Sequence, residues 1–61
     1  MENKNLCLCK TESLEYKNYL CGNEYNYEFC KEVESYKIYN EYGEFSWFTD
    51  FEMNHWFMIY L

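Results

Sequence analysis

Fifteen aromatic side chains in a chain of 61 residues are more than one small domain can bury. A domain of this size hides only about 60% of the surface that its unfolded chain exposes. We therefore predict a single domain over residues 1–61 that leaves several aromatic rings on its surface, where they are typical of the centres of protein interfaces. Domains this small usually need a disulfide, a metal ion or self-association to be stable.

One turn pattern lies at residues 40–43. Asn40 begins the sequence Asn-Glu-Tyr-Gly, and Asn at the first position with Gly at the fourth favours a type I turn. Gly43 can adopt the left-handed backbone that follows such a turn in a hairpin. We predict strands over about 35–39 and 44–48, with Tyr39 opposite Phe45.

The strongest local signal is a hairpin at Gly22-Asn23, which is a favoured two-residue turn. Folding the chain there pairs residues 16–21 with residues 24–29. Lys17 then lies opposite Glu28, as a complementary cross-strand pair of charges.

The segment Asn5 to Lys10 alternates two sets of apolar residues, which is typical of a strand covered on both faces. His55 to Leu61 is rich in β-forming residues and is predicted as a strand. A helix is the alternative there, because Thr49-x-x-Glu52 has the pattern of a capping box.

These patterns together predict a mainly β fold, with a small antiparallel sheet made of two hairpins plus terminal strands. The alternative is an α+β fold with a short helix at about 11–21 or 50–60. The helix at 11–21 would be capped by Thr11 and ended by Gly22.

Four cysteines at positions 7, 9, 21 and 30 raise the question of a zinc site. If zinc were bound, Cys7, Cys9, Cys21 and Cys30 would be its ligands, since a structural site uses four such donors. The hairpin predicted at Gly22-Asn23 places Cys21 beside the turn and Cys30 at its open end, about 20 Å apart at ~3.3 Å per residue. We therefore predict no metal and no cofactor, with reduced cysteines acting as small apolar side chains.

The sequence contains no catalytic pattern. Its single histidine, His55, has no recognisable nucleophile or orienting group near it in the sequence. Phosphate loops, dinucleotide-binding motifs and redox C-x-x-C pairs are also missing from the sequence. We predict that the protein is not an enzyme.

The formal net charge of −6 disfavours direct binding to nucleic acid, whose phosphates repel an acidic protein. The same charge favours a larger protein with a basic site. The predicted acidic binding surface consists of Glu24, Glu28, Glu41 and Glu44. Carboxylates spaced along a strand can imitate phosphates, although they can equally serve only to keep an aromatic protein in solution.

Self-association is the remaining way to stabilise so small a domain, and a two-fold dimer is its commonest form. We predict a homodimer whose aromatic interface uses Trp47, Phe48, Trp56, Phe57 and Ile59. The N-terminus has no apolar leader pattern, and 56–61 is too short to span a bilayer, so we expect a cytoplasmic protein without a membrane partner.

The absence of Ala, Arg, Pro and Gln, with abundant Asn, Lys, Glu and Tyr, indicates an AT-rich, low-GC genome. In length, charge and composition the chain resembles the small acidic proteins with which phages inhibit host enzymes. That class includes inhibitors of restriction, of CRISPR and of other defence systems, of uracil-DNA glycosylase and of RNA polymerase; the Hachiman anti-defence proteins are one example of this size. The resemblance implies an inhibitor of a host defence or nucleic-acid-processing enzyme, and it transfers no site residues. The alternatives are a non-inhibitory accessory module and a small zinc-binding domain.

Overall fold

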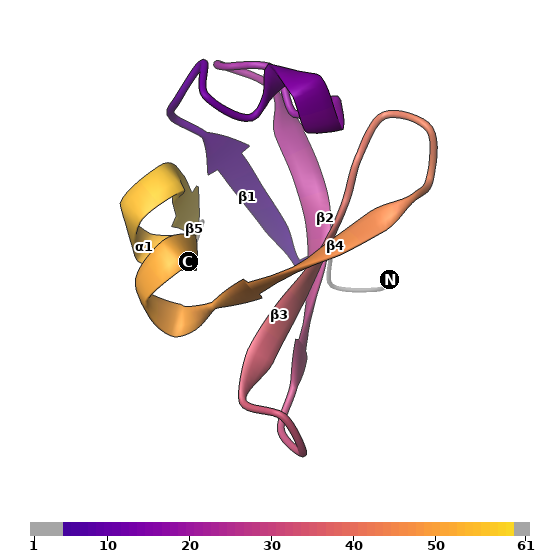
Figure 1. The fold of residues 1–61 in the computed structure, drawn as a ribbon, viewed down its shortest axis with the longest axis vertical. Coiled ribbons are helices and arrows are strands. Elements are labelled where there is room, and N and C mark those ends of the chain that lie inside the picture. Colours follow the sequence, from indigo (N-terminus) through magenta and orange to yellow (C-terminus); the bar gives the residue numbers. More distant parts are fainter. Residues whose placement is uncertain (1–4, 60–61) are drawn as a thin grey trace.

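The computed structural model describes residues 5–59, and they form a five-stranded antiparallel sheet with strand order β4-β3-β2-β1-β5 (Figure 1). The prediction of a mainly β fold is therefore confirmed. In chain order the elements are β1 (Leu6–Cys9), the 3-10 turn η1 (Glu15–Lys17), β2 (Glu24–Cys30), β3 (Ser35–Tyr39), β4 (Phe45–Thr49), α1 (Asp50–Trp56) and β5 (Phe57–Ile59).

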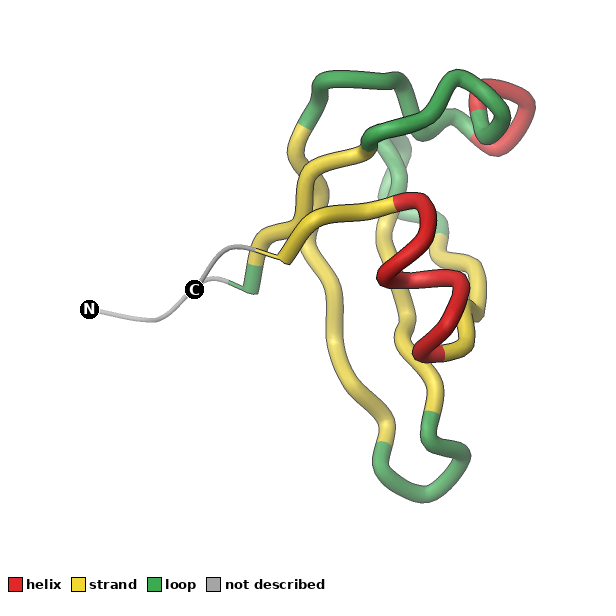
Figure 2. The backbone as a smooth tube through the Cα atoms, turned by 90° about the vertical axis from the view of Figure 1, so that its left-hand side faces the viewer, coloured by secondary structure: helices red, strands yellow, loops and turns green. Residues whose placement is uncertain are grey.

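Strand β2 belongs to both halves of the sheet. Its first residues pair with β1, with Tyr25 opposite Cys7, and its last residues pair with β3, with Phe29 opposite Tyr36. Because β2 changes partner along its length, the sheet bends into two halves around a common core. Figure 2 shows α1 joining β4, at one border of the sheet, to β5 at the other.

The core collects the inward side chains of every strand, of α1 and of the loop before β2. Tyr19 in that loop is fully buried, and its ring makes edge-to-face contacts with the rings of Tyr25, Phe48 and Phe57. The buried residues are Cys7, Cys9, Leu14, Tyr19, Tyr25, Ile38, Phe48, Met53 and Phe57. One connected cluster is what a domain of this size can sustain.

The hairpin predicted at residues 40–43 is confirmed. β3 and β4 pair with Tyr39 opposite Phe45. The side-chain oxygen of Asn40 accepts hydrogen bonds from the backbone N–H groups of Tyr42 (2.8 Å) and Glu44 (3.1 Å). Gly43 has a φ of 82°, the left-handed conformation that such a turn requires.

The hairpin predicted at Gly22-Asn23 is wrong. Residues 16–21 do not pair with β2, because β1 lies along that edge and the turn itself pairs with the end of β1. There the backbone N–H of Gly22 donates to Cys9 and the N–H of Cys9 donates to Asn23. Glu28 consequently lies opposite Lys37 of β3, and the predicted pair with Lys17 does not form.

Segment 11–21 is neither the predicted strand nor the alternative helix. It is a loop that contains η1 and then reverses at Asn18, whose φ is 71°. The N–H of Tyr19 donates to Leu14 (3.2 Å), so the loop closes on itself and turns the Tyr19 side chain into the core. The second hairpin of the sheet is instead β2–β3, whose turn spans 31–34.

At the C-terminus the capping box of the alternative helix is present. The N–H of Glu52 donates to the Thr49 hydroxyl (3.1 Å), and the N–H of Thr49 donates to the Glu52 carboxylate (2.9 Å). The helix therefore forms, but it lasts only seven residues before β5 pairs with β1. The strand predicted over 55–61 is correct only for Phe57–Ile59, and residues 60–61 lie outside the described part.

Strand β1 is confirmed with both faces covered to different extents. Cys7 and Cys9 are fully buried on the inner face, while Leu6 and Leu8 are partly buried on the other. In the described part of the chain, no helix is both long enough and apolar enough to cross a bilayer.

Candidate binding surface

The outer face of the β2–β3–β4 half carries both acidic and aromatic side chains. Strand alternation turns Tyr25 and Ile38 inward, so their neighbours point outward. Glu24 and Glu28 therefore lie on the outer face of β2, beside Tyr39 of β3, whose hydroxyl donates to Glu28 (3.4 Å). The sequence predicted the acidic residues of this face but not the tyrosine between them.

Next to these acids lies an aromatic strip, which we define as Tyr39, Phe45 and Trp47. Ring centroids are 5.7 Å apart for Tyr39 and Phe45 and 5.8 Å apart for Phe45 and Trp47. Lys37 covers part of the strip, with its ammonium nitrogen 4.8 Å from the centre of the Phe45 ring and 5.6 Å from that of Trp47. Phe45 and Trp47 still keep 45% and 48% of their surface exposed.

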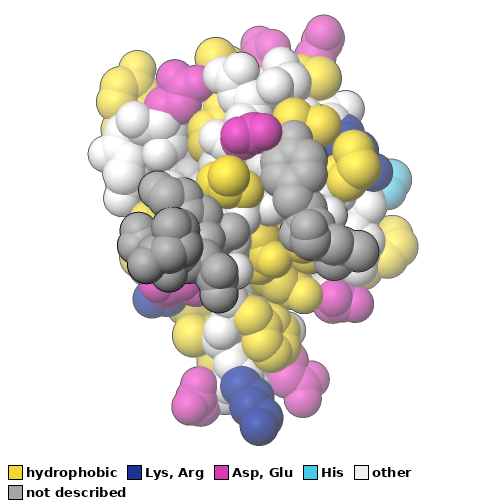
Figure 3. Space-filling view, turned by 180° about the vertical axis from the view of Figure 1, so that it is seen from behind, with side chains coloured by type: hydrophobic (Ala, Val, Ile, Leu, Met, Phe, Trp, Pro, Cys, Tyr) yellow, Lys and Arg dark blue, Asp and Glu magenta, His cyan; other side chains and the backbone are white. Residues whose placement is uncertain are grey.

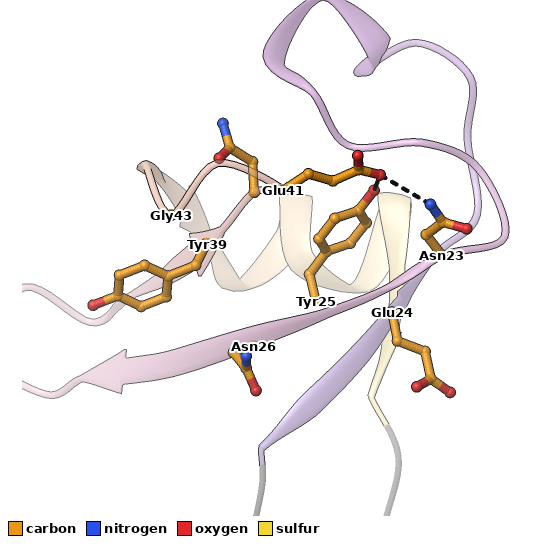
Figure 4. Close-up of a pocket in the computed structure, with 8 residues that line it drawn as sticks. Asn23, Glu24, Tyr25, Asn26, Tyr39, Glu41 and Gly43 are labelled. Carbon is orange, nitrogen blue, oxygen red and sulfur yellow. Dashed lines mark hydrogen bonds between the residues drawn. The ribbon is translucent and has the colours of Figure 1, made fainter.

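Beyond Tyr39 the sheet opens into a hollow of about 710 Å³, which we call the acidic hollow (Figure 4). It lies between the first residues of β2 and the turn that joins β3 to β4. Its lining residues are Asn23, Glu24, Tyr25, Asn26, Tyr39, Asn40, Glu41 and Gly43. The lining contains two carboxylates, three amides and two phenols but no lysine, so hydrogen-bond acceptors and negative charge dominate it.

Glu41 is held in place at the wall of this hollow. One carboxylate oxygen accepts from the Tyr25 hydroxyl (3.1 Å) and from the side-chain amide of Asn23 (3.0 Å), as Figure 4 shows. The Tyr25 hydroxyl in turn accepts from the backbone N–H of Leu20 (2.7 Å). The stretch 20–25 thus fixes one exposed carboxylate on the 40–43 turn, and the second oxygen of that carboxylate has no hydrogen bond within the described residues.

Tyr25 keeps its proton in this arrangement. Burial raises the pKa of the Tyr25 phenol above its ordinary value, and the charge and hydrogen bond of Glu41 raise it further. Hydrogen bonds from Leu20 and Asn23 act in the opposite direction but do not reverse the shift. The phenol therefore remains a donor to Glu41 throughout the neutral range.

The turn that carries Glu41 is anchored to the rest of the molecule by Asn40. Its side-chain amide donates to the carbonyl of Lys17 (3.0 Å) and to the carboxylate of Glu44 (3.3 Å). The hollow is thus bounded by two loops that are tied together, which limits how far its walls can move.

The backbone of β2 also faces the hollow. Asn23, Tyr25 and Tyr27 direct their backbone groups toward β1, as shown by the bonds from Cys9 to Asn23 and from Tyr27 to Asn5. Backbone groups alternate along a strand, so those of Glu24 point toward the other edge, before the register with β3 begins at Tyr27. The carbonyl of Glu24 adds another acceptor at this edge.

The four predicted acidic residues are all exposed. Glu24 and Glu41 line the hollow, and Glu28 and Glu44 are hydrogen-bonded to two further lining residues, Tyr39 and Asn40. Figure 4 shows that the Glu24 side chain points to the opposite side of β2 from Tyr25, so the two lining carboxylates do not converge on one point.

The predicted aromatic interface is divided by the structure. Phe48 and Phe57 are core residues, 4% and 1% exposed, so their inclusion in a surface was wrong. Trp56 and Ile59 are partly buried against the core, and Trp47 is half exposed. For Phe48 the reason is strand geometry: successive side chains of a strand point to opposite faces, so Phe48 points inward because Trp47 points outward.

Sequence reasoning missed Phe45, although the same strand geometry places it beside Trp47 on the outer face. It also missed Phe51, which is 75% exposed on α1 and stacks on His55 with ring centroids 5.7 Å apart. No sequence pattern marks Tyr25 as the residue that positions Glu41, because that contact depends on the loop geometry.

The cysteines do not gather at one place. Cys7 and Cys9 are buried, whereas Cys21 is exposed. Cys30 is the last residue of β2, and it lies five residues beyond Tyr25, the residue opposite Cys7. That spacing is about 16 Å along a strand. Among residues 5–59 no group of three or more His, Cys, Asp or Glu side chains is arranged to hold a metal ion.

Burial raises the pKa of the Cys7 thiol to about 12, and the neighbouring Cys9 adds to the shift. The pKa of Cys9 is raised as well, mainly by burial. Both inner thiols are therefore protonated and unreactive near neutral pH.

On the face seen in Figure 3, acidic side chains lie mainly toward the two ends of the molecule, with hydrophobic side chains between them. The sequence carries eleven acidic residues against five lysines, so basic groups are too few to neutralise them.

The chain matches no family model, and no curated protein or solved structure is significantly similar to it.

Proposed function

We propose that this protein acts by binding a basic site on a larger protein, with the acidic hollow receiving a Lys or Arg side chain of that partner. The observation that carries the proposal is the fixed carboxylate of Glu41 in a lining that contains no lysine. A carboxylate that is already positioned loses little conformational entropy when it accepts a partner's side chain.

An arginine guanidinium suits this hollow best. It carries five N–H donors in a planar fork, and the hollow offers acceptors in several directions. These include the second oxygen of Glu41, the carbonyl of Glu24 and the side-chain oxygens of Asn23 and Asn26. Tyr39 forms one wall and can stack on the guanidinium plane.

The net charge of −6 supports the same kind of partner over longer distances. Attraction between opposite charges speeds the encounter of two proteins. Salt weakens this attraction, because the Debye length is only ~8 Å at physiological ionic strength. Lys- or Arg-lined channels that normally hold nucleic acid are sites of this type.

Occupying such a channel would inhibit its owner by competition. We therefore propose an inhibitor of a host nucleic-acid-processing or defence enzyme, in the cytoplasm of the cell where that enzyme acts. This mechanism uses no catalytic group and no cofactor of the small protein. A non-inhibitory accessory module is distinguished from it by one result: its partner binds but keeps full activity.

The test begins with a tagged pull-down from host lysate and identification of stoichiometric partners. Affinity is then measured by calorimetry for Glu41→Gln, which keeps the shape of the side chain and a hydrogen bond to Tyr25 while removing the charge. Glu32→Gln is the matched control, because Glu32 is also exposed but lies in the 31–34 turn.

We expect Glu41→Gln to weaken binding about tenfold or more, in line with a loss of ~1.5–3 kcal/mol for a hydrogen bond to a charged group. Glu32→Gln should leave affinity unchanged, and added salt should slow association of the wild type. Unchanged binding by Glu41→Gln, together with its loss in a folded Trp47→Ala variant, would show that recognition is hydrophobic and that the hollow is not the site.

A further inference from the structure

The free edge of β4 has the properties of an interface with a second copy of this chain. Within residues 5–59 β4 is one of the two border strands of the sheet, and its sequence Phe-Ser-Trp-Phe-Thr contains no charge and no proline. Proteins usually protect such an edge with a lysine, a proline or a bulge, because unpaired backbone groups there pair with other strands. β4 has none of these within its five residues, in a chain that carries six net negative charges elsewhere.

The backbone groups that face this edge can be assigned from the hairpin. The N–H of Asn40 donates to the carbonyl of Glu44 (2.7 Å), so Glu44, Ser46 and Phe48 direct their backbone groups toward β3. Phe45 and Trp47 therefore direct theirs outward. Thr49 does so too, but its N–H is taken by the Glu52 carboxylate in the capping box.

We propose that two copies pair along this edge, antiparallel and about a two-fold axis at Ser46, so that Phe45 of each copy lies opposite Trp47 of the other. In this register every outward N–H and carbonyl of Phe45 and Trp47 finds a partner. An antiparallel pair of identical strands is two-fold symmetric, so the same edge serves both copies and the assembly closes as a dimer.

The side chains agree with the same register. Phe45 and Trp47 lie on the outer face in both copies, so pairing them keeps one continuous outer face and covers two half-exposed rings. Aromatic cross-strand pairs are among the favourable pairs in sheets. Shifting the register by one residue would place Trp47 opposite Ser46 and turn inner side chains against outer ones.

The dimer is expected to be weak and to respond to salt in a characteristic way. The turn at 40–44 and helix α1 limit the pairing to the middle of β4, so the interface is smaller than the ~1,600 Å² of a standard one. Two copies with a charge of −6 repel each other, and salt screens this repulsion. Salt should therefore strengthen the dimer while it weakens binding of a basic partner, so failure of one proposal leaves the other intact.

The decisive experiment replaces one backbone N–H with N–CH3 and leaves every side chain unchanged. A chain of this length is accessible to chemical synthesis, so Trp47 can be replaced by its N-methyl form. The matched control is N-methyl-Ile59, in the other border strand, β5. The N–H of Lys10 donates to the carbonyl of Trp56, so the backbone groups of Trp56 and Met58 face β1. Because these groups alternate along a strand, the N–H of Ile59 faces away from β1, as that of Trp47 faces away from β3. Sedimentation velocity over a series of rising protein concentrations gives the mass of each protein.

We expect the wild type and N-methyl-Ile59 to become dimers with rising concentration, and N-methyl-Trp47 to remain a monomer with an unchanged circular dichroism spectrum. A monomeric wild type over the whole range would overturn the proposal, as would a dimeric N-methyl-Trp47. Loss of association in N-methyl-Ile59 would also overturn it, because that result indicates head-to-tail pairing of β4 with β5.

A cross-link provides a second measurement if N-methylation unfolds the chain. Opposite residues of a non-hydrogen-bonded antiparallel pair have Cα atoms about 4.5 Å apart, which a disulfide can span. Ser46→Cys, in a Cys21→Ser background, should form a 46-to-46 disulfide on mild oxidation, identified by mass spectrometry. Ser13→Cys, in an exposed loop, is the control and should cross-link much more slowly. Equal rates for the two would contradict the pairing.

Discussion

Tyr19 is the residue through which the loop between β1 and β2 is joined to the rest of the fold. Its side chain is completely buried, its ring contacts three other rings edge to face, and its hydroxyl donates to the carbonyl of Ile38. The same loop supplies the Leu20 N–H to Tyr25 and the Lys17 carbonyl to Asn40. Loosening Tyr19 should therefore destabilise both the core and the acidic hollow.

Two substitutions separate the contributions of the hydroxyl and the ring. Tyr19→Phe keeps the ring contacts and removes one hydrogen bond, which should lower the free energy of unfolding by about 0.5–1.5 kcal/mol. Tyr19→Ala also empties the space of the ring, and comparable aromatic truncations cost about 3–5 kcal/mol. A 61-residue domain has a total stability of only roughly 3–9 kcal/mol, so Tyr19→Ala should be mostly or wholly unfolded.

Urea unfolding followed by tryptophan fluorescence measures both values. Protein concentration must be kept low and fixed, because a dimer would make the apparent stability depend on it. Tyr16→Ala is the control, since Tyr16 belongs to the same loop but is 76% exposed. A loss below about 1 kcal/mol for Tyr19→Ala, similar to that of Tyr16→Ala, would show that the loop is not packed into the core as described.

Two further predictions concern α1 and the thiols. Thr49→Ala removes the capping box of a seven-residue helix and should cost about 1 kcal/mol in the urea experiment, whereas the exposed neighbour substitution Asp50→Asn should cost less. Cys7 keeps its proton longer when folded than when unfolded, so its contribution to stability is complete below pH 9 and is lost between pH 9 and about 12. This one group changes the free energy of unfolding by at most about 1.4 kcal/mol per pH unit. In alkaline urea titrations Cys7→Ala should make the free energy of unfolding depend less steeply on pH. An unchanged dependence on pH would contradict the assignment to Cys7.

Several features of the fold followed from local sequence. The hairpin at 40–43 and its register with Tyr39 opposite Phe45 were predicted correctly, and the capping-box pattern at Thr49, which supported the helical alternative to the favoured strand, is present. Each depends on side chains that act within a few residues, such as Asn40 on the N–H groups of its own turn. The exposure of the four acidic residues was also predictable, because burying an unpaired carboxylate is costly.

Features that depend on distant partners were not predictable. Gly22 and Asn23 do form a turn, but β1 takes the edge of β2 that residues 16–21 were expected to occupy. The β2–β3 turn has no glycine, asparagine or proline at 31–34, and Glu34 itself adopts a φ of 51°. Such a turn is stabilised by the strands that it joins rather than by its own sequence.

Composition, alternation and short-range turn chemistry do not depend on the rest of the fold, so the mainly β character, the acidic exterior and the surplus of aromatic rings can be predicted from the sequence. Which rings are buried, how Tyr25 and Asn23 position Glu41, and which strand edges of residues 5–59 remain free depend on the tertiary structure. They do so because strand pairing brings together residues far apart in the chain. Which strand pairs with β2 depends on how well the whole core then packs around Tyr19, and the local sequence of β2 does not contain that information.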